Sequence, residues 1–300
     1  MKKAGFLLFT PLALAISSLC EEAGTPLRRV AFVRDAAIWT ANLDGTKMRK
    51  LIDGDNPCIS PDGTKVAFTM SPSRGKETVR YIAVAEIATG ETNFFKETPS
   101  DNCFGPVWSP DGAQITFEIF VENRWRLALV NADGRAFRFL ELPSEDLGWW
   151  SVTWAPDGKS IFCQDLEKIC RFSLDGGLLA SWEIQKTIPR GVMDSSKRLS
   201  VSNDGKRLLI NINMDEDVSL KDWEGPPPAI WLFDIPSGRA TRLTPKKSYA
   251  SDSCWVGDSE FLLVDADRNG KWSSVFRASI AGGKPQLVIK NAADPSVSKE

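Results

Sequence analysis

Short segments in which apolar and polar residues alternate follow one another along almost the whole chain, separated by Pro, Gly and Asp. Alternation with period two is typical of half-buried β-strands, and Pro and Gly at this density interrupt helices. One segment returns five times, at Cys58–Phe68, Val107–Phe117, Thr153–Cys163, Ser200–Ile210 and, in shortened form, Cys254–Leu263. The pattern predicts an all-β fold built from one repeated unit.

Each copy of this segment reads as a strand, a tight turn and a second strand. The first strand ends near a large apolar residue, which is Ile59, Trp108, Trp154, Val201 or Trp255. Pro-Asp-Gly, or a relative of it, then forms the turn, because Pro fixes φ and Gly accepts a positive φ. The turn aspartates are Asp62, Asp111, Asp157, Asp204 and Asp258, and they recur roughly every 50 residues. Asp before Gly caps its own turn, so these carboxylates need no catalytic role.

A second series of turns predicts two more strands in each unit. These turns are Asp44-Gly45, Thr89-Gly90, Asp133-Gly134, Asp175-Gly176, Ser237-Gly238 and Gly282-Gly283. Each unit therefore has four strands, named A to D from the inside outward, and four-stranded units of this length are typical of β-propeller blades. The sequence predicts a six-bladed β-propeller over residues 21–300.

The two ends of the chain predict how the ring closes. Asp294–Ser298 matches Asn56–Ser60, which is a strand A, whereas residues 29–51 begin with strand B. We therefore expect the C-terminal strand to complete the N-terminal blade, which removes the open edges of the ring.

The first 20 residues have the pattern of a secretory signal peptide. Lys2 and Lys3 precede an apolar stretch at residues 6–19, which is too short to span a membrane. Ala13-Leu14-Ala15 offers a cleavage site, and Cys20 offers a lipoprotein anchor as the alternative. The mature chain is expected to be periplasmic or secreted, with the membrane reached only through lipidation of Cys20.

Composition excludes several kinds of chemistry. The chain has no His, which removes His-based nucleophile pairs, His general bases and His-ligated metals. The net charge of −2 gives no field that would attract nucleic acid. The cysteines do not form an evident disulfide framework, although Cys163 and Cys170 could face each other across a hairpin as a disulfide or as two buried thiols.

The Trp-Ser-Pro-Asp-Gly core at residues 108–112, and its variant at 154–158, resembles the repeat of the TolB family of propellers. The resemblance covers the propeller half of that family, without the α/β domain that precedes it there. It implies a periplasmic protein that binds partner proteins, as TolB binds the peptidoglycan-associated lipoprotein. Because propellers carry many functions, the resemblance is more specific for fold than for activity.

The expected binding surface lies where loops vary in length. A–B and C–D turns are uniformly short, whereas the B–C hairpins and the D–A connections, which share the other face, vary. The loops of blades three to five supply Arg124, Trp125, Trp149, Trp150, Arg190 and Trp223. Trp and Arg dominate binding hot spots, so these residues are predicted to bind a partner protein or, by stacking, a carbohydrate. The alternative for Trp149 and Trp150 is packing between blades.

A polar position near the channel carries the prediction of a metal. Asn56, Asp252 and Asp294 occupy it in three consecutive blades and could begin a calcium site, calcium being the one cofactor left open. The alternative is a polar position of the repeat that hydrogen-bonds around the channel.

A binding scaffold of the cell envelope is the function that the sequence favours. The alternative is a carbohydrate-active hydrolase or lyase, because two carboxylates suffice for glycoside hydrolysis. Its candidate residues are Asp215, Glu216, Asp217, Asp252 and Asp294. A calcium-dependent lactonase-type enzyme is a third hypothesis, and the sequence does not decide whether the protein is an enzyme.

Overall fold

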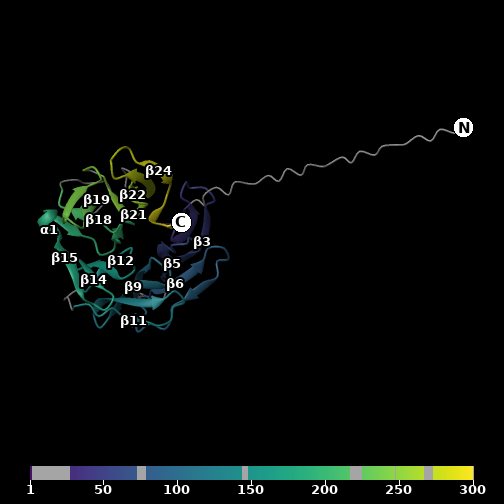
Figure 1. Cartoon of the computed structure of the whole chain (residues 1–300), viewed down its shortest axis with the longest axis horizontal. Coiled ribbons are helices and arrows are strands. Elements are labelled where there is room, and N and C mark those ends of the chain that lie inside the picture. The colour runs from purple at the N-terminus through teal and green to yellow at the C-terminus, as the bar shows by residue number, and fades with distance from the viewer. Residues whose placement is uncertain are drawn as a thin grey trace.

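The computed structural model describes residues 1, 28–72, 79–143, 148–216, 225–246, 248–266 and 273–299. Six antiparallel sheets stand side by side in a ring, as Figure 1 shows in the progression of colour around the centre. The predicted six-bladed β-propeller is therefore confirmed. The predicted signal peptide beyond Met1, Cys20, Asp217 and Trp223 lie outside the described residues.

Blades one to three each contain four strands. Blade one is formed by β25 (Ala293–Val297), β1 (Arg29–Arg34), β2 (Ala37–Asn42) and β3 (Arg49–Asp53). Blade two is formed by β4 (Asp55–Ile59), β5 (Lys65–Met70), β6 (Tyr81–Glu86) and β7 (Thr92–Phe94). Blade three is formed by β8 (Cys103–Trp108), β9 (Gln114–Val121), β10 (Arg124–Asn131) and β11 (Arg138–Phe139).

Blades four and six repeat this plan, and blade five modifies it. Blade four is formed by β12 (Trp150–Trp154), β13 (Ser160–Gln164), β14 (Lys168–Ser173) and β15 (Leu178–Glu183), followed by the short helix α1 (Ile184–Thr187). Blade five has its strand A split into β16 (Gly191–Met193) and β17 (Ser200–Val201), beside β18 (Arg207–Met214), β19 (Pro228–Asp234) and β20 (Arg239–Arg242). Blade six is formed by β21 (Ala250–Val256), β22 (Glu260–Ala266), β23 (Ser273–Ser279) and β24 (Gln286–Ile289).

The ring closes through the C-terminal strand, as the sequence predicts. In β25, Val297 pairs with Val30 and Ser296 pairs with Ala31 of β1. The Ser296 hydroxyl also accepts a hydrogen bond from the backbone N–H of Ile59 in the next blade, at 3.0 Å. The last strand A thus joins blade one to blade two and leaves no open edge between them.

The hydrophobic core lies between the blades. Each core cluster combines residues of two neighbouring sheets, such as Ile82 and Phe117 of blades two and three, or Phe162 and Phe233 of blades four and five. Each of these phenylalanines is at most 1% exposed. Burying an aromatic side chain stabilises a fold by about 2–3 kcal/mol. Packing between the sheets therefore fixes the ring as a rigid support for its two faces.

Candidate functional site

The inner strands carry a shared irregularity that turns polar residues towards the central channel. Asn56, Gly105, Ser151, Asp252 and Asp294 have φ between 48° and 62°, and each lies where its inner strand shifts register. A left-handed residue inside a strand forms a bulge that redirects side chains. The polar position that the sequence indicates is therefore a structural feature of five blades, and in blade five an inserted segment, residues 194–199, replaces it.

Polar residues of strand B support the bulges of blades three and four. The Glu118 carboxylate accepts the backbone N–H of Ser151 at 2.7 Å, and the Thr69 hydroxyl accepts that of Gly105 at 3.2 Å. Gln164 donates to the carbonyl of Asp194 at 3.2 Å, at the start of the inserted segment. Polar contacts of this kind link successive blades around the channel.

Asp252 and Asp294 meet at this level and form an ionic cluster with Lys197. Lys197 Nζ lies 2.6 Å from Asp252 Oδ1, and Asp294 shares a hydrogen bond with Asp252. Burial raises the pKa of Asp294 to about 7; the charge of Asp252 adds to this, and Lys197 and Arg198 oppose it. Burial lowers the pKa of Lys197, but the two carboxylates outweigh burial, so it is raised. The cluster therefore holds a positive Lys197 and a proton on the carboxyl pair up to about neutral pH.

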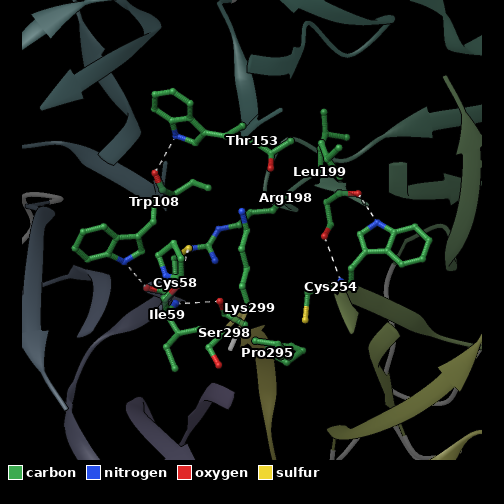
Figure 2. Close-up of a pocket in the computed structure, with 18 of the residues that line it drawn as sticks. Cys58, Ile59, Trp108, Thr153, Arg198, Leu199, Cys254, Pro295, Ser298 and Lys299 are labelled. Carbon is green, nitrogen blue, oxygen red and sulfur yellow. Dashed lines mark hydrogen bonds between the residues drawn. The ribbon is translucent and has the colours of Figure 1, made fainter. Parts of the chain in front are cut away.

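Arg198 spans the channel from blade five to blade two. Its guanidinium donates to the carbonyl of Pro57 at 2.7 Å and also to the carbonyl of Asn56. Its own carbonyl accepts a hydrogen bond from Asn211 of β18 at 3.4 Å. The inserted segment is thus held at both ends, and Arg198 lies in the middle of the ring (Figure 2).

Glu118 is a second carboxyl group with a raised pKa at this level. Its side chain is buried, and burial raises its pKa to about 8 even though the N–H of Ser151 and the charges of Arg198 and Arg80 lower it. A buried acid with these partners is the kind of group found at functional sites, although structural networks produce the same shift.

A cavity of about 210 Å³ runs along the channel from this polar level to the A–B turns. Its walls include Trp108, Trp154 and Trp255. The indole N–H of each donates a hydrogen bond to a backbone carbonyl in strand A of the preceding blade. Figure 2 shows Arg198 and Lys299 directed into the centre of this space.

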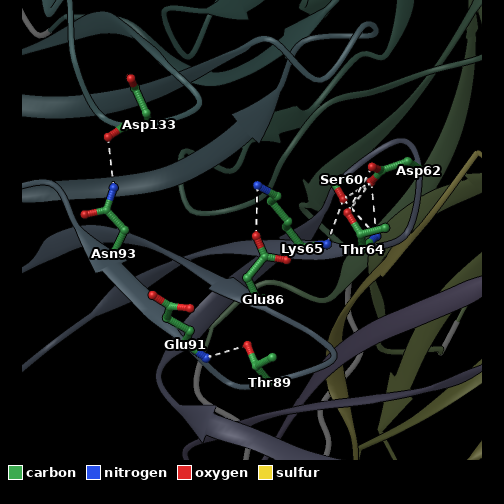
Figure 3. A network of polar contacts seen from close by, with 9 residues as sticks. All are labelled: Ser60, Asp62, Thr64, Lys65, Glu86, Thr89, Glu91, Asn93 and Asp133. Atoms are coloured by element: carbon green, nitrogen blue, oxygen red, sulfur yellow. Dashed lines mark hydrogen bonds and ion pairs between the residues drawn. The ribbon is translucent and has the colours of Figure 1, made fainter.

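The A–B turns surround the outer end of the cavity and confirm the structural interpretation of their aspartates. Asp62 Oδ1 accepts the hydroxyl of Ser60 at 2.5 Å and the N–H of Thr64 at 3.1 Å (Figure 3). The same contacts recur at Asp111 and Asp204. Each proline of a turn also lies beside the glycine of the next turn, as Pro61 does beside Gly112. These carboxylates stabilise the turns, so the turn face is uniform.

Two of the residues predicted to bind a partner are buried. Trp149 and Trp150 are 5% and 9% exposed. The indole N–H of Trp149 donates to the carbonyl of Pro143 at 2.9 Å, and its ring packs edge-on against Phe172. Trp149 and Trp150 are therefore buried, which agrees with the alternative of packing, and a binding role for either stays a prediction.

The other predicted residues lie in two places. Arg124, Trp125 and Trp149 line a small pocket of about 90 Å³ on blade three. Trp125 is half-buried and contacts Phe120, with the Arg80 guanidinium over its ring. Arg190 is exposed on blade five and pairs with Asp215 at 2.6 Å. The structure does not bring these residues into one continuous patch.

The described carboxylates of the set proposed for sugar chemistry are paired with cations or with each other. Asp215 pairs with Arg190, Glu216 with Arg242, and Asp252 with Lys197. Asp252 and Asp294 are hydrogen-bonded, which is closer than the separation of about 5 Å or more that glycosidases use. This geometry does not favour the glycosidase hypothesis.

The predicted calcium set assembles only in part. Asp252 and Asp294 are in contact, and Lys197 supplies the positive charge beside them. Among the described residues, no three His, Cys, Asp or Glu side chains are arranged to hold a metal ion. Calcium stays a prediction for this position.

Cys163 and Cys170 face each other across β13 and β14 with their sulfurs as thiols.

Sequence reasoning missed Lys197, Glu118 and the reach of Arg198 across the channel. One signal could have found Glu118. Thr69, Glu118, Gln164 and Asn211 each lie nine residues after the first residue of their turn segment, at Ser60, Ser109, Ala155 and Ser202. A polar residue repeated at that offset in an otherwise apolar strand B indicates a contact with the next blade. Lys197 lies in an insertion that has no counterpart in the other units.

The fold defines a six-bladed β-propeller, and comparison with solved structures agrees. The chain is similar to TolB from Acinetobacter baumannii, with a TM-score of 0.59 and 17% identity over 90% of this chain and 66% of that one. It is similar to a putative TolB from Agrobacterium tumefaciens, with a TM-score of 0.63 and 18% identity over 88% and 89% of the two chains. It is also similar to a chain of a nidogen/laminin complex, with a TM-score of 0.65 and 13% identity over 90% and 98%.

These likenesses establish the fold, which is that of TolB-type propellers. The chain spans about two thirds of the length of the Acinetobacter protein. Similarity also extends to a puromycin hydrolase, with a TM-score of 0.56 and 15% identity over 87% of this chain and 42% of that one. No family model matches the chain. No curated protein matches it either.

A search of the described helices for one that is long and apolar enough to cross a membrane found none.

Proposed function

We propose that the protein is an exported binding scaffold of the bacterial cell envelope and that a partner protein docks on its loop face. The loop face is the side of the ring that carries the B–C hairpins and the D–A connections. The observation that carries the proposal is the contrast between this face and the uniform turn face. Loops that differ in length and chemistry on a rigid support commonly carry binding function.

An exposed group on blade five supplies a candidate contact. Arg190, Val192 and Asp215 lie together, since β16 pairs with β18 next to them and the N–H of Asp215 donates to the carbonyl of Arg190. Val192 is 53% exposed, so its side chain is accessible to a partner. An apolar residue between two exposed charges is a suitable centre for a protein contact. We call these three residues the blade-five patch.

The paired state of the carboxylates supports binding over catalysis. Asp215, Glu216 and Asp252 each have a cationic partner, so none is positioned as a free general base. The solved TolB structures and the nidogen/laminin complex support a protein partner in general, by likeness of fold.

The test is capture of partners from envelope extract with matched variants. The purified protein serves as bait, beside Arg190→Glu/Val192→Asp on the loop face and Lys159→Glu/Leu287→Asp away from it. Lys159 lies in an A–B turn and Leu287 on the outer strand β24, and both are exposed. We expect a retained protein to be lost with the first variant and kept with the second. Equal retention by both variants would contradict the proposed face, and retention of no protein would contradict the scaffold function.

A further inference from the structure

The channel cavity has no part in docking on the loop face, and its chemistry points to a small ligand. The cavity opens among the A–B turns, at the opposite side of the ring from the variable loops. Its volume of about 210 Å³ is on the scale of small-molecule sites. It is therefore suited to a small molecule rather than to a folded element of a partner.

The wall of the cavity has both polar and apolar parts, and the apolar part is the larger. Trp108, Trp154 and Trp255 contribute ring surface, and their N–H groups are already bonded to carbonyls. Val107 and Val297 extend the same wall. A ligand body in contact with this wall should be apolar or aromatic, because a strongly hydrated body would lose its water there without replacement.

Positive charge is concentrated inside this apolar wall. Arg198 reaches into the cavity from the inner end and Lys299 from the outer end, and Arg28 also lines the cavity. Arg198 donates two of its five N–H groups to the carbonyls of Asn56 and Pro57, which leaves donors for a ligand. Burial lowers the pKa of Lys299, and Asp111 opposes this shift.

The two acids of the cavity do not cancel this charge. Asp252 is engaged by Lys197 and by the hydroxyl of Ser251 at 3.2 Å. Asp294 shares a hydrogen bond with Asp252, and burial raises its pKa to about 7, so the carboxyl pair carries a proton below neutral pH. The remaining charge that faces the cavity is therefore cationic.

We propose that the channel cavity binds a small organic carboxylate, with its apolar body against the tryptophan wall and its carboxylate on Arg198 and Lys299. A planar guanidinium matches a carboxylate geometrically, which favours this anion. The apolar wall argues against inorganic phosphate, which has no apolar surface to bury. The proposal does not rest on partner capture, so the two can fail separately.

Binding of such an anion should depend on pH through Asp294. The charged groups that face Asp294 are Asp252 on β21 and Lys197 and Arg198 on the inserted segment. An incoming carboxylate favours the protonated form of Asp294, so the complex takes up a proton near neutral pH. Affinity is therefore higher at pH 6 than at pH 8.

The test compares phenylacetate with phenylacetamide, a neutral molecule of nearly the same shape. Calorimetry measures binding to the intact protein at pH 6 and pH 8, and tryptophan fluorescence reports occupancy because three indoles line the cavity. We expect the acid to bind at least about tenfold more tightly than the amide at pH 6. Equal affinity of the two probes, or no binding of either at about 10 mM, would overturn the proposal.

Two variants locate the site. Lys299→Met removes a charge at the rim, where the side chain is exposed, and should reduce the preference for the acid about threefold. Arg198→Gln should abolish the preference. If Arg198→Gln does not fold, since it loses the link to blade two, the Lys299→Met variant decides. A full preference for the acid in Lys299→Met would then contradict the assignment, as would a full preference in a folded Arg198→Gln.

Discussion

The two faces of the ring differ in how similar their segments are from blade to blade. On the turn face, Asp62, Asp111 and Asp204 each accept a hydroxyl and a backbone N–H within their own turn. The prolines of three turns also lie beside the glycine of the next turn. On the loop face, the hairpin after β1 has two residues and the one after β18 extends from Asp215 to Pro227. The turns are fixed by hydrogen bonds and by packing against each other, whereas the loops can differ in length without disturbing the inner strands. The regular turns therefore belong to the support of the ring, and the variable loops are the proposed place of recognition.

The channel lies between the two faces and belongs to neither pattern. Its polar level keeps the repeat in five blades, as bulges, and breaks it in blade five, where residues 194–199 bring Lys197 and Arg198 to the axis. The break concentrates charge at a place where the other blades supply only short polar side chains and carboxylates. Variants of the framework, the channel and the loops should therefore differ in their effects on stability and binding.

The largest effect is expected from the framework. Trp154→Ala removes a ring that is 5% exposed and a hydrogen bond to the carbonyl of Val107. The free energy of unfolding should fall by about 3–5 kcal/mol, as for other buried aromatic residues replaced by alanine. Urea denaturation followed by circular dichroism measures it. A loss below about 1 kcal/mol would show that the walls of the channel do not hold the ring together.

The channel predicts a dependence of stability on pH. The folded-state pKa values of Asp294 and Glu118 are raised to about 7 and about 8, so both groups bind a proton more tightly when folded. Their contribution is complete below their unfolded values near pH 4 and is lost as pH rises through 7 and 8. These two pKa values correspond to a fall in stability of at most roughly 6 kcal/mol between pH 5 and pH 8.

Replacing Glu118 and Asp294 by neutral amides tests whether these two groups cause the change of stability with pH. Denaturation midpoints of Glu118→Gln and Asp294→Asn between pH 5 and pH 8 should each show a flatter profile than the natural protein. An unchanged slope in both variants would mean that other groups set the dependence.

Replacing a turn aspartate should lower the free energy of unfolding by less than the changes in the framework and the channel. Asp111→Ala removes the acceptor for the hydroxyl of Ser109 and the N–H of Ala113. We expect a loss of about 1 kcal/mol in the free energy of unfolding, typical of a capping side chain. The matched change Asp204→Ala should give a similar loss, and a much larger one at either site would indicate a role beyond the turn.

The smallest effect on stability is expected on the loop face. Arg190→Ala breaks an ion pair in which both side chains are 71% exposed. Such pairs contribute less than about 1 kcal/mol, so thermal unfolding should be almost unchanged. If the same change nevertheless weakens partner capture, Arg190 acts in binding and not in stability. A clear drop in the unfolding temperature would contradict this separation of roles.

The sequence contains most of the fold and little of the site. Pro-Asp-Gly turns and alternating strands determine local structure, and their recurrence predicts the blade count and the closing strand at Asp294–Ser298. Trp149 and Trp150 illustrate the limit, because composition indicates a large apolar ring but not which side of a blade it packs on. Lys197 and Arg198 could not be placed, since their partners are distant in sequence and meet only across the closed channel.

The most direct test of the central claim, that the loop face receives the partner, is site-specific photo-crosslinking in the cell envelope. A photoreactive amino acid replaces Arg190 on the loop face in one strain and Lys159 on the turn face in another, both being exposed positions. We expect a defined crosslinked product from position 190 and none from position 159. A product from position 159 alone, or equal products from both, would contradict it.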